Sequence, residues 1–453
     1  MSRRTSETYQ RVADSATRWV LDQVRWDDGP WVPWSVDGSD EQEPPGDRDG
    51  LHSGIGGLAL LLAEVRLTRP WTGEEQRLAD AIADRLRGQV ATQTDCTFFD
   101  GLVSTLGALL ALDADGTDAV VARLLALAEA DGWPQTVATG PRYAEGARVT
   151  DLTLGTAGVL IGALWAHRHD VPGAADLAGL AADVALAEAE ERTTGLTWRM
   201  VPARFWTAEP GAEMPNLSHG TAGVAAALAV SGAELGRPDL VAAAHRGAEH
   251  LVSLGDLTDD GAGLVVRRQL VHNEDLDEVT HTWCHGGTGT STLFLALDRA
   301  GVADVAGESP LTWHRRSLHA VATSGLPARL HPGFWDNDGR CCGTAGVGDV
   351  FLDSWRRTGD EQQLAFALHL ADTLVDRALL QDGQACWRFV EHRADPPLLP
   401  PGVGWMQGTA GIAAYLHRAA RVVEHGPAAG WLPRMDTWWT APAAPTAGST
   451  VRG

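Results

Sequence analysis

Residues 281–295 read "HTWCHGGTGTSTLFL" and place a thiol and an imidazole directly before a glycine turn that leads into an apolar run. Residues 340–352 repeat this pattern as "RCCGTAGVGDVFL", with two cysteines before the glycine. A pattern that recurs after a few tens of residues indicates a repeat architecture along the whole chain.

The alignment reveals seven copies of the pattern. The other five read "LHSGIGGLALLL" (51–62), "FFDGLVSTLGALL" (98–110), "LTLGTAGVLIGAL" (152–164), "LSHGTAGVAAAL" (217–228) and "WMQGTAGIAAYL" (405–416). The aligned glycines are Gly54, Gly101, Gly155, Gly220, Gly286, Gly343 and Gly408. Six copies keep a second glycine three residues later, and the copy at Gly101 is degenerate.

The run after each glycine is apolar nearly all round, which is typical of a helix buried on most sides. Amphipathic stretches such as "EEQRLADAIADRLRGQV" (74–90) lie between the copies, and "TYQRVADSATRWVLDQV" (8–24) precedes the first. These stretches favour outer helices with one solvated face. Seven inner and seven outer helices predict an all-α protein, a closed α/α toroid, because closure covers the apolar ends that an open solenoid would expose.

The repeat also predicts the domain organisation. We expect one toroid domain over residues 8–439, between a disordered N-terminus (1–7) and a disordered tail (440–453) rich in small residues and proline. Short β-hairpins are expected to interrupt the ring at residues 195–206, 261–271 and 383–392, where β-forming residues alternate around turn residues.

Composition excludes several classes of function. The formal net charge of −23 argues against a nucleic-acid partner. The chain has no lysine, which excludes Schiff-base chemistry and a P-loop. No apolar run approaches a membrane span, so no stable membrane insertion is expected. Five cysteines without an export signal favour a cytoplasmic, reducing location over a disulfide framework.

The residues one and two positions before each glycine form two columns in the alignment. In a toroid every glycine turn lies at the same end, so these columns would line one central mouth. They hold three cysteines and three histidines, mostly in the adjacent copies four to six: Cys284, Cys341, Cys342, His52, His219 and His285.

Three thiols from neighbouring turns suit zinc, which prefers sulfur and nitrogen ligands in a tetrahedron and keeps an open position in catalytic sites. We therefore expect one Zn²⁺ per chain on Cys284, Cys341 and Cys342. The alternative is that Cys341 and Cys342 are small core residues, since free cysteine is often buried. Cys96 and Cys386 lie outside the columns and are interpreted as packing residues.

Position alone leaves two interpretations open for the polar residues near the mouth. His219 either caps its helix or acts in chemistry, and Asp151, in "VTDLTLGTAG", is either a turn residue or functional. Trp283 and Trp405 sit just before the mouth, where packing is the default interpretation.

The seven glycine copies, with "LSHGTAG", "WCHGG" and "CCGTAGVGD", resemble the LanC-like family of lanthionine-forming peptide cyclases over roughly residues 8–425. The resemblance implies a double toroid of seven helices each, with zinc at the central mouth. It matches Cys284 and Cys341 to the first and second zinc ligands. The third ligand is His in much of the family and is Cys342 here, as in the three-cysteine subgroup.

The resemblance also implies roles for polar residues. His219 and Asp151 match the family's active-site histidine and aspartate, and His285 occupies a position that is Tyr or His in relatives. Thr280 stands where some bacterial cyclases have Arg, so the role of that arginine does not carry over directly, and Arg267 or Arg268 from the preceding loop is the candidate to enter the site.

The implied reaction is the addition of a Cys thiol of a dehydrated precursor peptide to dehydroalanine or dehydrobutyrine, which forms (methyl)lanthionine. His219 would donate the proton, and Asp151 would orient His219 or take the thiol proton. The expected partners are that peptide and a separate dehydratase, because the chain has no extra length for a dehydratase domain.

Three alternatives remain open at this stage. A LanC-like transferase would add glutathione or another free thiol to dehydroamino acids with the same site. A non-catalytic zinc toroid would serve as a scaffold or leader-peptide binder. A helical-hairpin glycoside hydrolase would need two well-placed carboxylates, whereas the two columns supply only Asp100.

Overall fold

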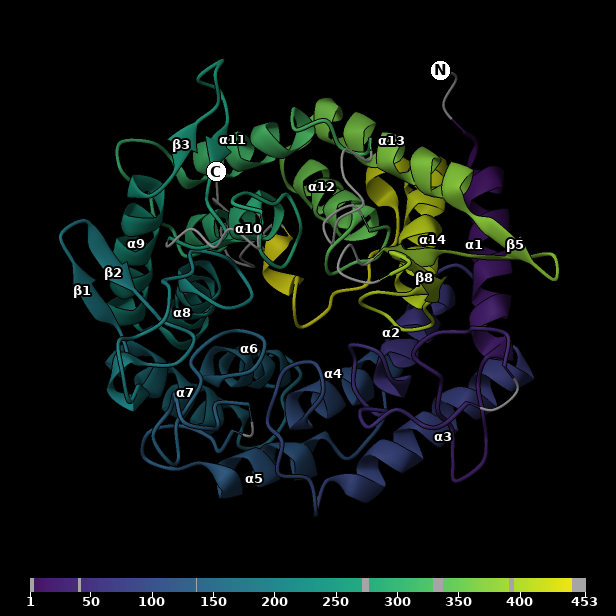
Figure 1. The fold of residues 1–453 in the computed structure, drawn as a ribbon, viewed down its shortest axis with the longest axis horizontal. Helices are drawn as coiled ribbons and strands as arrows, with labels where there is room; N and C mark the ends of the chain where they lie inside the picture. Colours follow the sequence, from purple (N-terminus) through teal and green to yellow (C-terminus); the bar gives the residue numbers. More distant parts are fainter. Residues whose placement is uncertain are drawn as a thin grey trace, which may run out of the picture.

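The computed structural model describes residues 4–39, 42–135, 137–270, 277–328, 337–390 and 395–441, and these contain fourteen α-helices in two concentric rings (Figure 1). The inner ring comprises α2 (Ile55–Arg66), α4 (Leu102–Leu112), α6 (Thr156–His167), α8 (Thr221–Leu235), α10 (Gly287–Arg299), α12 (Thr344–Thr358) and α14 (Thr409–His425). The outer ring comprises α1 (Ser6–Asp22), α3 (Gly73–Gln89), α5 (Thr117–Leu127), α7 (Ala174–Ala187), α9 (Pro238–Ser253), α11 (Pro310–Ala322) and α13 (Glu361–Arg377). The predicted all-α toroid is confirmed.

The inner helices are those that follow the seven glycines, and their side chains are buried on nearly every face. Each inner helix contacts the next, and α14 contacts α2, which closes the ring. The N-terminal helix α1 packs on α14 and completes the outer ring, where Tyr9 donates a hydrogen bond to Asp372 of α13 at 2.6 Å. The degenerate copy still forms an inner helix, α4.

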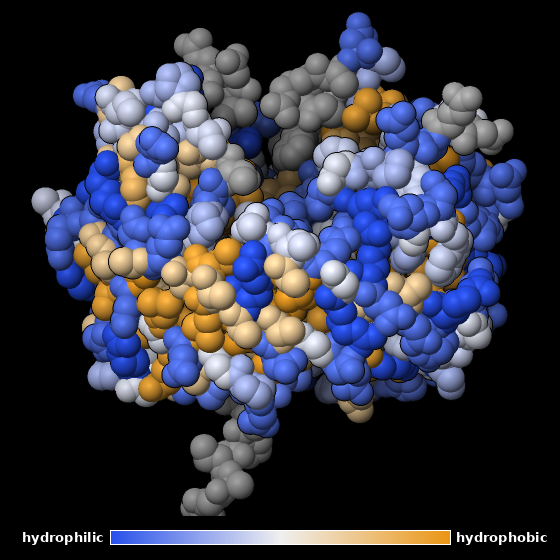
Figure 2. Space-filling view, turned by 90° about the horizontal axis from the view of Figure 1, so that it is seen from below, coloured by the Kyte–Doolittle hydropathy of each residue, from blue (hydrophilic) through white to orange (hydrophobic). Residues whose placement is uncertain are grey.

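The outer helices present one face to solvent, and hydrophobic residues lie among hydrophilic ones on the wall that includes α5 (Figure 2). Several outer helices begin with a side-chain cap, and α3 has a full capping box between Thr72 and Glu75. The inner helices begin instead at glycine N-caps with no side-chain hydrogen bond.

The second glycine of the repeat is explained by crowding. A Cβ atom at Gly346 would lie 1.8 Å from the carbonyl oxygen of Arg340, and one at Gly289 would lie 1.8 Å from that of Trp283. In all six copies that keep this glycine, the carbonyl of the residue six positions earlier lies against it. The loop before each inner helix therefore folds back onto the first turn of that helix.

Four two-stranded antiparallel hairpins decorate the ring. They are β1 (Glu190–Arg192) with β2 (Gly195–Thr197), β3 (Asp256–Leu257) with β4 (Leu264–Val265), β5 (Leu379–Gln381) with β6 (Gln384–Cys386), and β7 (Arg388–Val390) with β8 (Leu398–Pro401).

Each of the three predicted stretches contains a strand, but every such strand pairs with a strand outside its own stretch. In the stretches 195–206 and 261–271 the strand pairs with residues before the stretch, and the stretch 383–392 contains one strand from each of two hairpins. The reason is the position of the turn: Asp382 and Gly383, with φ of 51° and 80°, form the tight turn of the β5–β6 hairpin. Residues 271 and 391–392 lie outside the described residues.

The chain ends differ slightly from the predicted boundaries. Helix α1 begins at Ser6, where the Thr5 side chain accepts a hydrogen bond from the Thr8 amide. At the other end, the 3₁₀ turn η4 (Trp438–Thr440) is buried, so Thr440 belongs to the ordered ring rather than to the tail. Among the described residues, every helix is too short or too polar to cross a bilayer.

Candidate active site

The seven glycine turns are joined edge to edge by backbone hydrogen bonds, which we call the turn belt. It runs from Met406 N to His52 O (2.9 Å), Cys341 N to Met406 O (2.8 Å), Cys284 N to Cys341 O (3.3 Å), Ser218 N to Cys284 O (3.0 Å), Thr153 N to Ser218 O (3.4 Å), Phe98 N to Thr153 O (3.0 Å) and His52 N to Phe99 O (3.2 Å). The belt returns to its start, so the residues two positions before each glycine encircle one mouth, as the alignment predicted.

The three column cysteines come together on this belt. The Sγ atoms of Cys284 and Cys342 lie 3.4 Å apart, as do those of Cys342 and Cys341, and all three lie within 4.8 Å of one another. Cys284 and Cys342 are buried, while Cys341 is partly exposed toward the mouth. The Thr282 hydroxyl lies 3.4 Å from the Cys284 sulfur.

The environment of the cluster favours one thiolate. Burial opposes ionisation of Cys284, but hydrogen bonds from Cys341 and Cys342 and the nearby His285 outweigh it, so the pKa of Cys284 is well below its usual value. The pKa of Cys341 is raised because its thiol hydrogen bonds to Cys284, and that of Cys342 is raised chiefly by burial. Cys284 is therefore the sulfur that ionises first.

This donor set fits zinc. A Zn–S distance of about 2.3 Å in a tetrahedron requires sulfur atoms roughly 3.8 Å apart, close to the separations of the three thiols. Soft thiolate ligands select zinc over calcium, magnesium or manganese. Three protein ligands also leave the fourth tetrahedral position open, which is the arrangement of a catalytic rather than a structural zinc site.

His219 and Asp151 form a hydrogen-bonded pair at the mouth. Asp151 is fully buried, and its Oδ2 lies 2.6 Å from Nδ1 of the half-buried His219, while its Oδ1 accepts from the Leu154 amide at 2.7 Å. Because an ionised carboxylate only accepts, the proton of the neutral imidazole lies on Nδ1. Nε2 is thereby left as the nitrogen that can take or give a proton.

The pKa of His219 is raised despite its burial, because the negative charges of Asp151 and Cys284 stabilise the imidazolium. The His219 backbone is held as well, since its amide donates to the Asn216 side chain at 2.8 Å. The structure thus brings together His219 and Asp151, which position in the sequence alone left ambiguous.

His285 lies between the cysteine cluster and the His219–Asp151 pair. Its ring centroid is 5.2 Å from that of His219, and its amide donates to the Thr282 hydroxyl at 3.3 Å. His285 is adjacent in sequence to Cys284, and its charge favours the Cys284 thiolate. All six residues predicted for the site therefore lie at one mouth.

The two arginines of the preceding loop differ in position. Arg267 is exposed and pairs with Asp256 and Glu278, away from the mouth. Arg268 is half-buried, and its charge opposes protonation of His219, so it lies near the site. Thr280 is buried, with its hydroxyl 3.4 Å from that of Thr282.

An apolar groove of about 360 Å³ adjoins the mouth beside the first and last glycine turns. It is lined by Trp34, Phe389, Leu399 and Pro400, and by the column residues Ser53 and Gln407. Beneath the mouth, Phe99 contacts both the His52 and the Trp283 ring. The packing interpretation of Trp283 and Trp405 holds, as both are buried.

Sequence reasoning missed Thr282 and Asn216, which touch the site directly. Asn216 also binds the backbone carbonyl of Arg268 at 3.2 Å, so it ties that loop to the His219 turn. An Asn three residues before a helix-start histidine is a local capping pattern, and this signal could have identified it. Cys96 and Cys386 are buried away from the cluster, and burial raises the pKa of their thiols to about 12 and about 11.

Several solved protein structures are similar to this chain. Nisin cyclase superposes with a TM-score of 0.55 at 16% sequence identity, covering 83% of this chain and 89% of its own. A sugar epimerase from a ruminal bacterium superposes with a TM-score of 0.49 at 11% sequence identity, covering 93% of this chain and 98% of its own. Cellobiose 2-epimerase from Spirochaeta thermophila superposes with a TM-score of 0.46 at 14% identity, covering 92% of this chain and 96% of its own. No curated protein matches the sequence.

A protein-family model described as "Lanthionine synthetase C-like protein" matches residues 46–424. The match spans all seven glycine turns, the three clustered cysteines and the His219–Asp151 pair. The chain therefore belongs to the LanC-like family.

Proposed function

We propose that this protein is a zinc-dependent lanthionine-forming cyclase whose substrate is a dehydrated precursor peptide made by a separate dehydratase. The observation that carries the proposal is the meeting, at one mouth, of a three-thiol cluster and a hydrogen-bonded His–Asp pair. A metal-activated thiol and a proton donor are the two requirements of thiol addition to a dehydroamino acid.

The reaction forms one S–C bond between the thiol sulfur and the β-carbon of the dehydro residue. The sulfur loses its proton and the α-carbon gains one, so the product has the mass of the substrate. A zinc ion held by Cys284, Cys341 and Cys342 would supply a position for the substrate thiol and a lowered thiol pKa.

The remaining steps belong to side chains of the protein. His219, with Nδ1 held by Asp151, presents Nε2 for proton transfer and is the donor to the α-carbon. Asp151 keeps the imidazole in this tautomer and stabilises its protonated form. His285, next to Cys284, favours the anionic state of the cluster.

Metal analysis tests the proposal. The purified protein should contain one equivalent of zinc, and Cys284→Ala should lose most of it. Cys386→Ala is the matched control, because Cys386 is buried outside the cluster and should leave the zinc content unchanged. Full zinc retention in Cys284→Ala would overturn the assignment.

Activity is tested with a synthetic peptide that contains one Cys and one dehydroalanine. Cyclisation leaves the mass unchanged and removes the free thiol, which alkylation followed by mass spectrometry counts. Adding glutathione to the assay separates the transferase alternative, because transfer increases the peptide mass by one glutathione. Zinc binding without either reaction would favour the scaffold alternative.

A further inference from the structure

The C-terminal segment, residues 429–441, returns into the interior of the ring after α14. Its turn η4 packs against both α10 and α12 (Figure 1). Trp438 and Trp439 are buried, and the guanidinium groups of Arg168 and Arg299 lie 4.5 and 5.0 Å from the Trp438 ring. The segment is therefore part of the core of the ring rather than an appendage.

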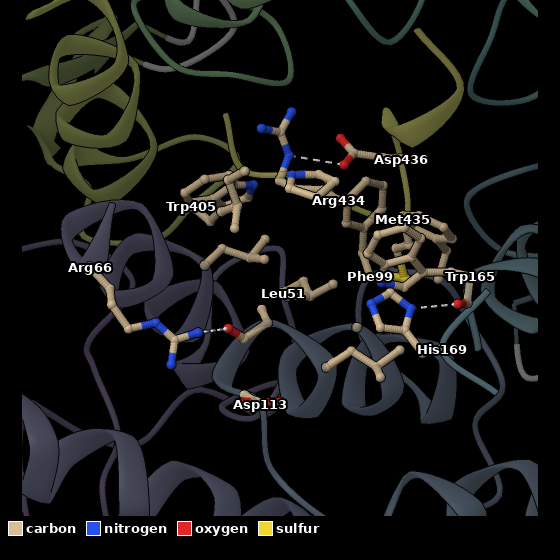
Figure 3. Close-up of a pocket in the computed structure, with 17 residues that line it drawn as sticks. Leu51, Arg66, Phe99, Asp113, Trp165, His169, Trp405, Arg434, Met435 and Asp436 are labelled. Carbon is tan, nitrogen blue, oxygen red and sulfur yellow. Dashed lines mark hydrogen bonds and ion pairs between the residues drawn. The ribbon is translucent and has the colours of Figure 1, made fainter. Parts of the chain in front are cut away.

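The middle of this segment lies below the mouth. Arg434, Met435 and Asp436 line a cavity of about 220 Å³ together with Leu51, Phe99 and Trp405, which come from the glycine-turn end of the ring (Figure 3). The same arginine and aspartate also line a small space of about 10 Å³ beside Trp283 and Arg340, the residues that directly precede Cys284 and Cys341. The segment thus reaches the underside of the cysteine turns.

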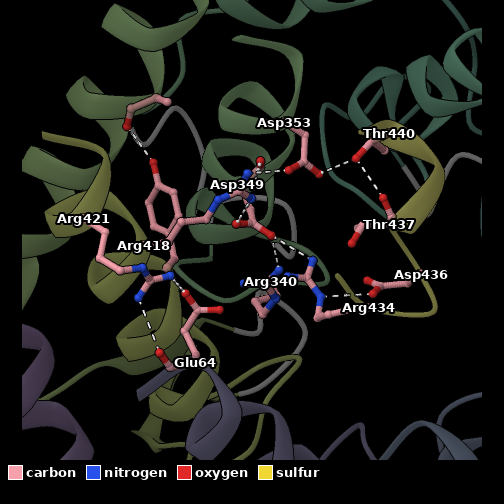
Figure 4. Close-up of polar contacts among 12 residues, drawn as sticks. Glu64, Arg340, Asp349, Asp353, Arg418, Arg421, Arg434, Asp436, Thr437 and Thr440 are labelled. Carbon is pink, nitrogen blue, oxygen red and sulfur yellow. Dashed lines mark hydrogen bonds and ion pairs between the residues drawn. The ribbon is translucent and has the colours of Figure 1, made fainter. Parts of the chain in front are cut away.

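Arg434 joins a buried charge network centred on Asp349 of α12 (Figure 4). Asp349 accepts from Arg434 at 2.9 Å, from Arg418 at 2.7 Å, and from Arg340. Asp353 pairs with Arg418 and accepts from Thr440 at 3.1 Å, and Asp436 accepts from Arg434 at 3.0 Å. Three arginines face three aspartates, so the network is neutral as a whole.

Arg340 connects this network to the cysteines, because it is the residue before Cys341. Its guanidinium binds Asp349 and lies 4.5 Å from the centre of the Trp405 ring. Its amide and that of Cys341 both donate to the Met406 carbonyl at 2.8 Å. Side chain and backbone together therefore anchor the start of the Cys341–Cys342 turn.

We propose that Arg434 is a positioning residue for the metal centre, acting through Asp349 and Arg340 to hold the Cys341–Cys342 turn in the geometry that brings the three thiols together. The inference rests on the proposed function insofar as that cluster binds zinc. Loss of Arg434 leaves the network with one uncompensated negative charge, and it removes one of the three arginines that fix the Asp349 carboxylate against Arg340. Groups that orient metal ligands typically contribute about 10–100-fold to metal affinity.

The test compares Arg434→Gln with Arg421→Gln in the full-length protein. Arg421 is the matched control, because it is equally buried and pairs with Glu64, but it touches neither Asp349 nor Arg340. Three quantities are measured: Zn²⁺ affinity by competition with a chelator, the rate at which iodoacetamide alkylates each cysteine of the metal-free protein, and the urea midpoint of unfolding.

Both variants should lower the urea midpoint, since each removes a buried arginine that neutralises a buried carboxylate. Only Arg434→Gln should weaken Zn²⁺ binding, by about 10–100-fold, and speed alkylation of Cys341 and Cys342. Equal Zn²⁺ affinities and alkylation rates in the two variants would show that Arg434 only stabilises the fold and would overturn the proposal.

A milder change keeps the test decisive if Arg434→Gln does not fold. Asp436→Asn removes the second partner of Arg434 and should change both readouts in the same direction but less; no change in either overturns the proposal. Failure of the proposed function is distinguishable from failure of this inference. The first would appear as absence of zinc or of cyclisation in the unmodified protein. The second would appear in the cysteine alkylation rates, which are measured without metal.

Discussion

At the scale of single residues, His219 provides the sharpest test of the proposed mechanism. His219→Ala should keep its zinc, because the cluster is made by the three cysteines, and should slow cyclisation by about 10²–10⁴-fold, the usual contribution of general acid catalysis. Asp151→Asn should also slow the reaction, since the amide no longer stabilises the imidazolium. Alkylation of the thiols left after reaction gives the rate, and metal analysis gives the zinc.

Two results would contradict this role. Loss of zinc from His219→Ala would make the histidine a ligand and displace one cysteine from the site. Cyclisation at the unmodified rate would mean that another group donates the proton, such as His285, whose ring centroid lies 5.2 Å from that of His219.

Asp100, directly before Gly101, predicts a pH dependence of stability. Burial, together with the Asp47 side chain, raises the pKa of Asp100 from 3.8 to about 8. A raised pKa gives stability that is complete below the unfolded pKa and is lost as the pH rises through the folded one. Relative to Asp100→Asn, which mimics the neutral acid, the unmodified protein should lose stability between about pH 4 and pH 8.

Urea midpoints of the two proteins across this range check the prediction. Midpoints that differ by the same amount at every pH would mean that Asp100 has an unperturbed carboxyl group in the folded protein.

At the scale of the elements, the repeated glycines explain why each inner helix begins where it does. At Gly346 a Cβ would collide with the Arg340 carbonyl, which is backbone and cannot turn aside. Gly346→Ala should therefore reduce the free energy of unfolding by about 3 kcal/mol or more, at the upper end of overpacking effects. Because the clash displaces the residue before Cys341, zinc affinity should fall as well.

Gly88→Ala is the control for this prediction. Gly88 lies in the outer helix α3, and nothing lies within 4 Å of the Cβ it would gain, so this change should stabilise by about 0.5–1 kcal/mol. Chemical unfolding measures both variants, and an unchanged stability of Gly346→Ala would refute the crowding explanation of the repeat.

At the scale of the whole molecule, buried histidines hold neighbouring helices of the ring together. His417 of α14 contacts Gln10 and Thr17 of α1, where the outer ring closes, and His314 of α11 contacts Ser291 of α10 and Ser354 of α12. Burial lowers the pKa of each to about 4. Each side chain is therefore neutral in the folded ring near neutral pH.

A lowered histidine pKa gives stability that is complete above the unfolded pKa of about 6.5 and is lost as the pH falls toward 4. His417→Gln should reduce the slope of unfolding free energy against pH in this window by about 1.4 kcal/mol per pH unit. His425→Gln, which replaces an exposed histidine, is the control. An identical slope in His417→Gln would contradict the neutral buried state.

The sequence by itself determined the number of inner helices, their order and the place where each begins, because a glycine turn and an apolar run are local features. It also determined which residues face the mouth, since position relative to the glycine is shared by all seven copies. The three thiols could be grouped for this reason, although Cys284 and Cys341 are distant along the chain.

Only the tertiary structure decided what surrounds these residues. The pairing of His219 with Asp151 depends on two neighbouring turns meeting along the belt, and the need for the second glycine depends on a carbonyl six residues away folding back onto the helix. The return of residues 429–441 beneath the mouth had no local signal, because the buried side chains that bind it come from α12 and α14. Long-range charge compensation in a closed ring is a property of the assembled helices, and no periodicity in the sequence encodes it.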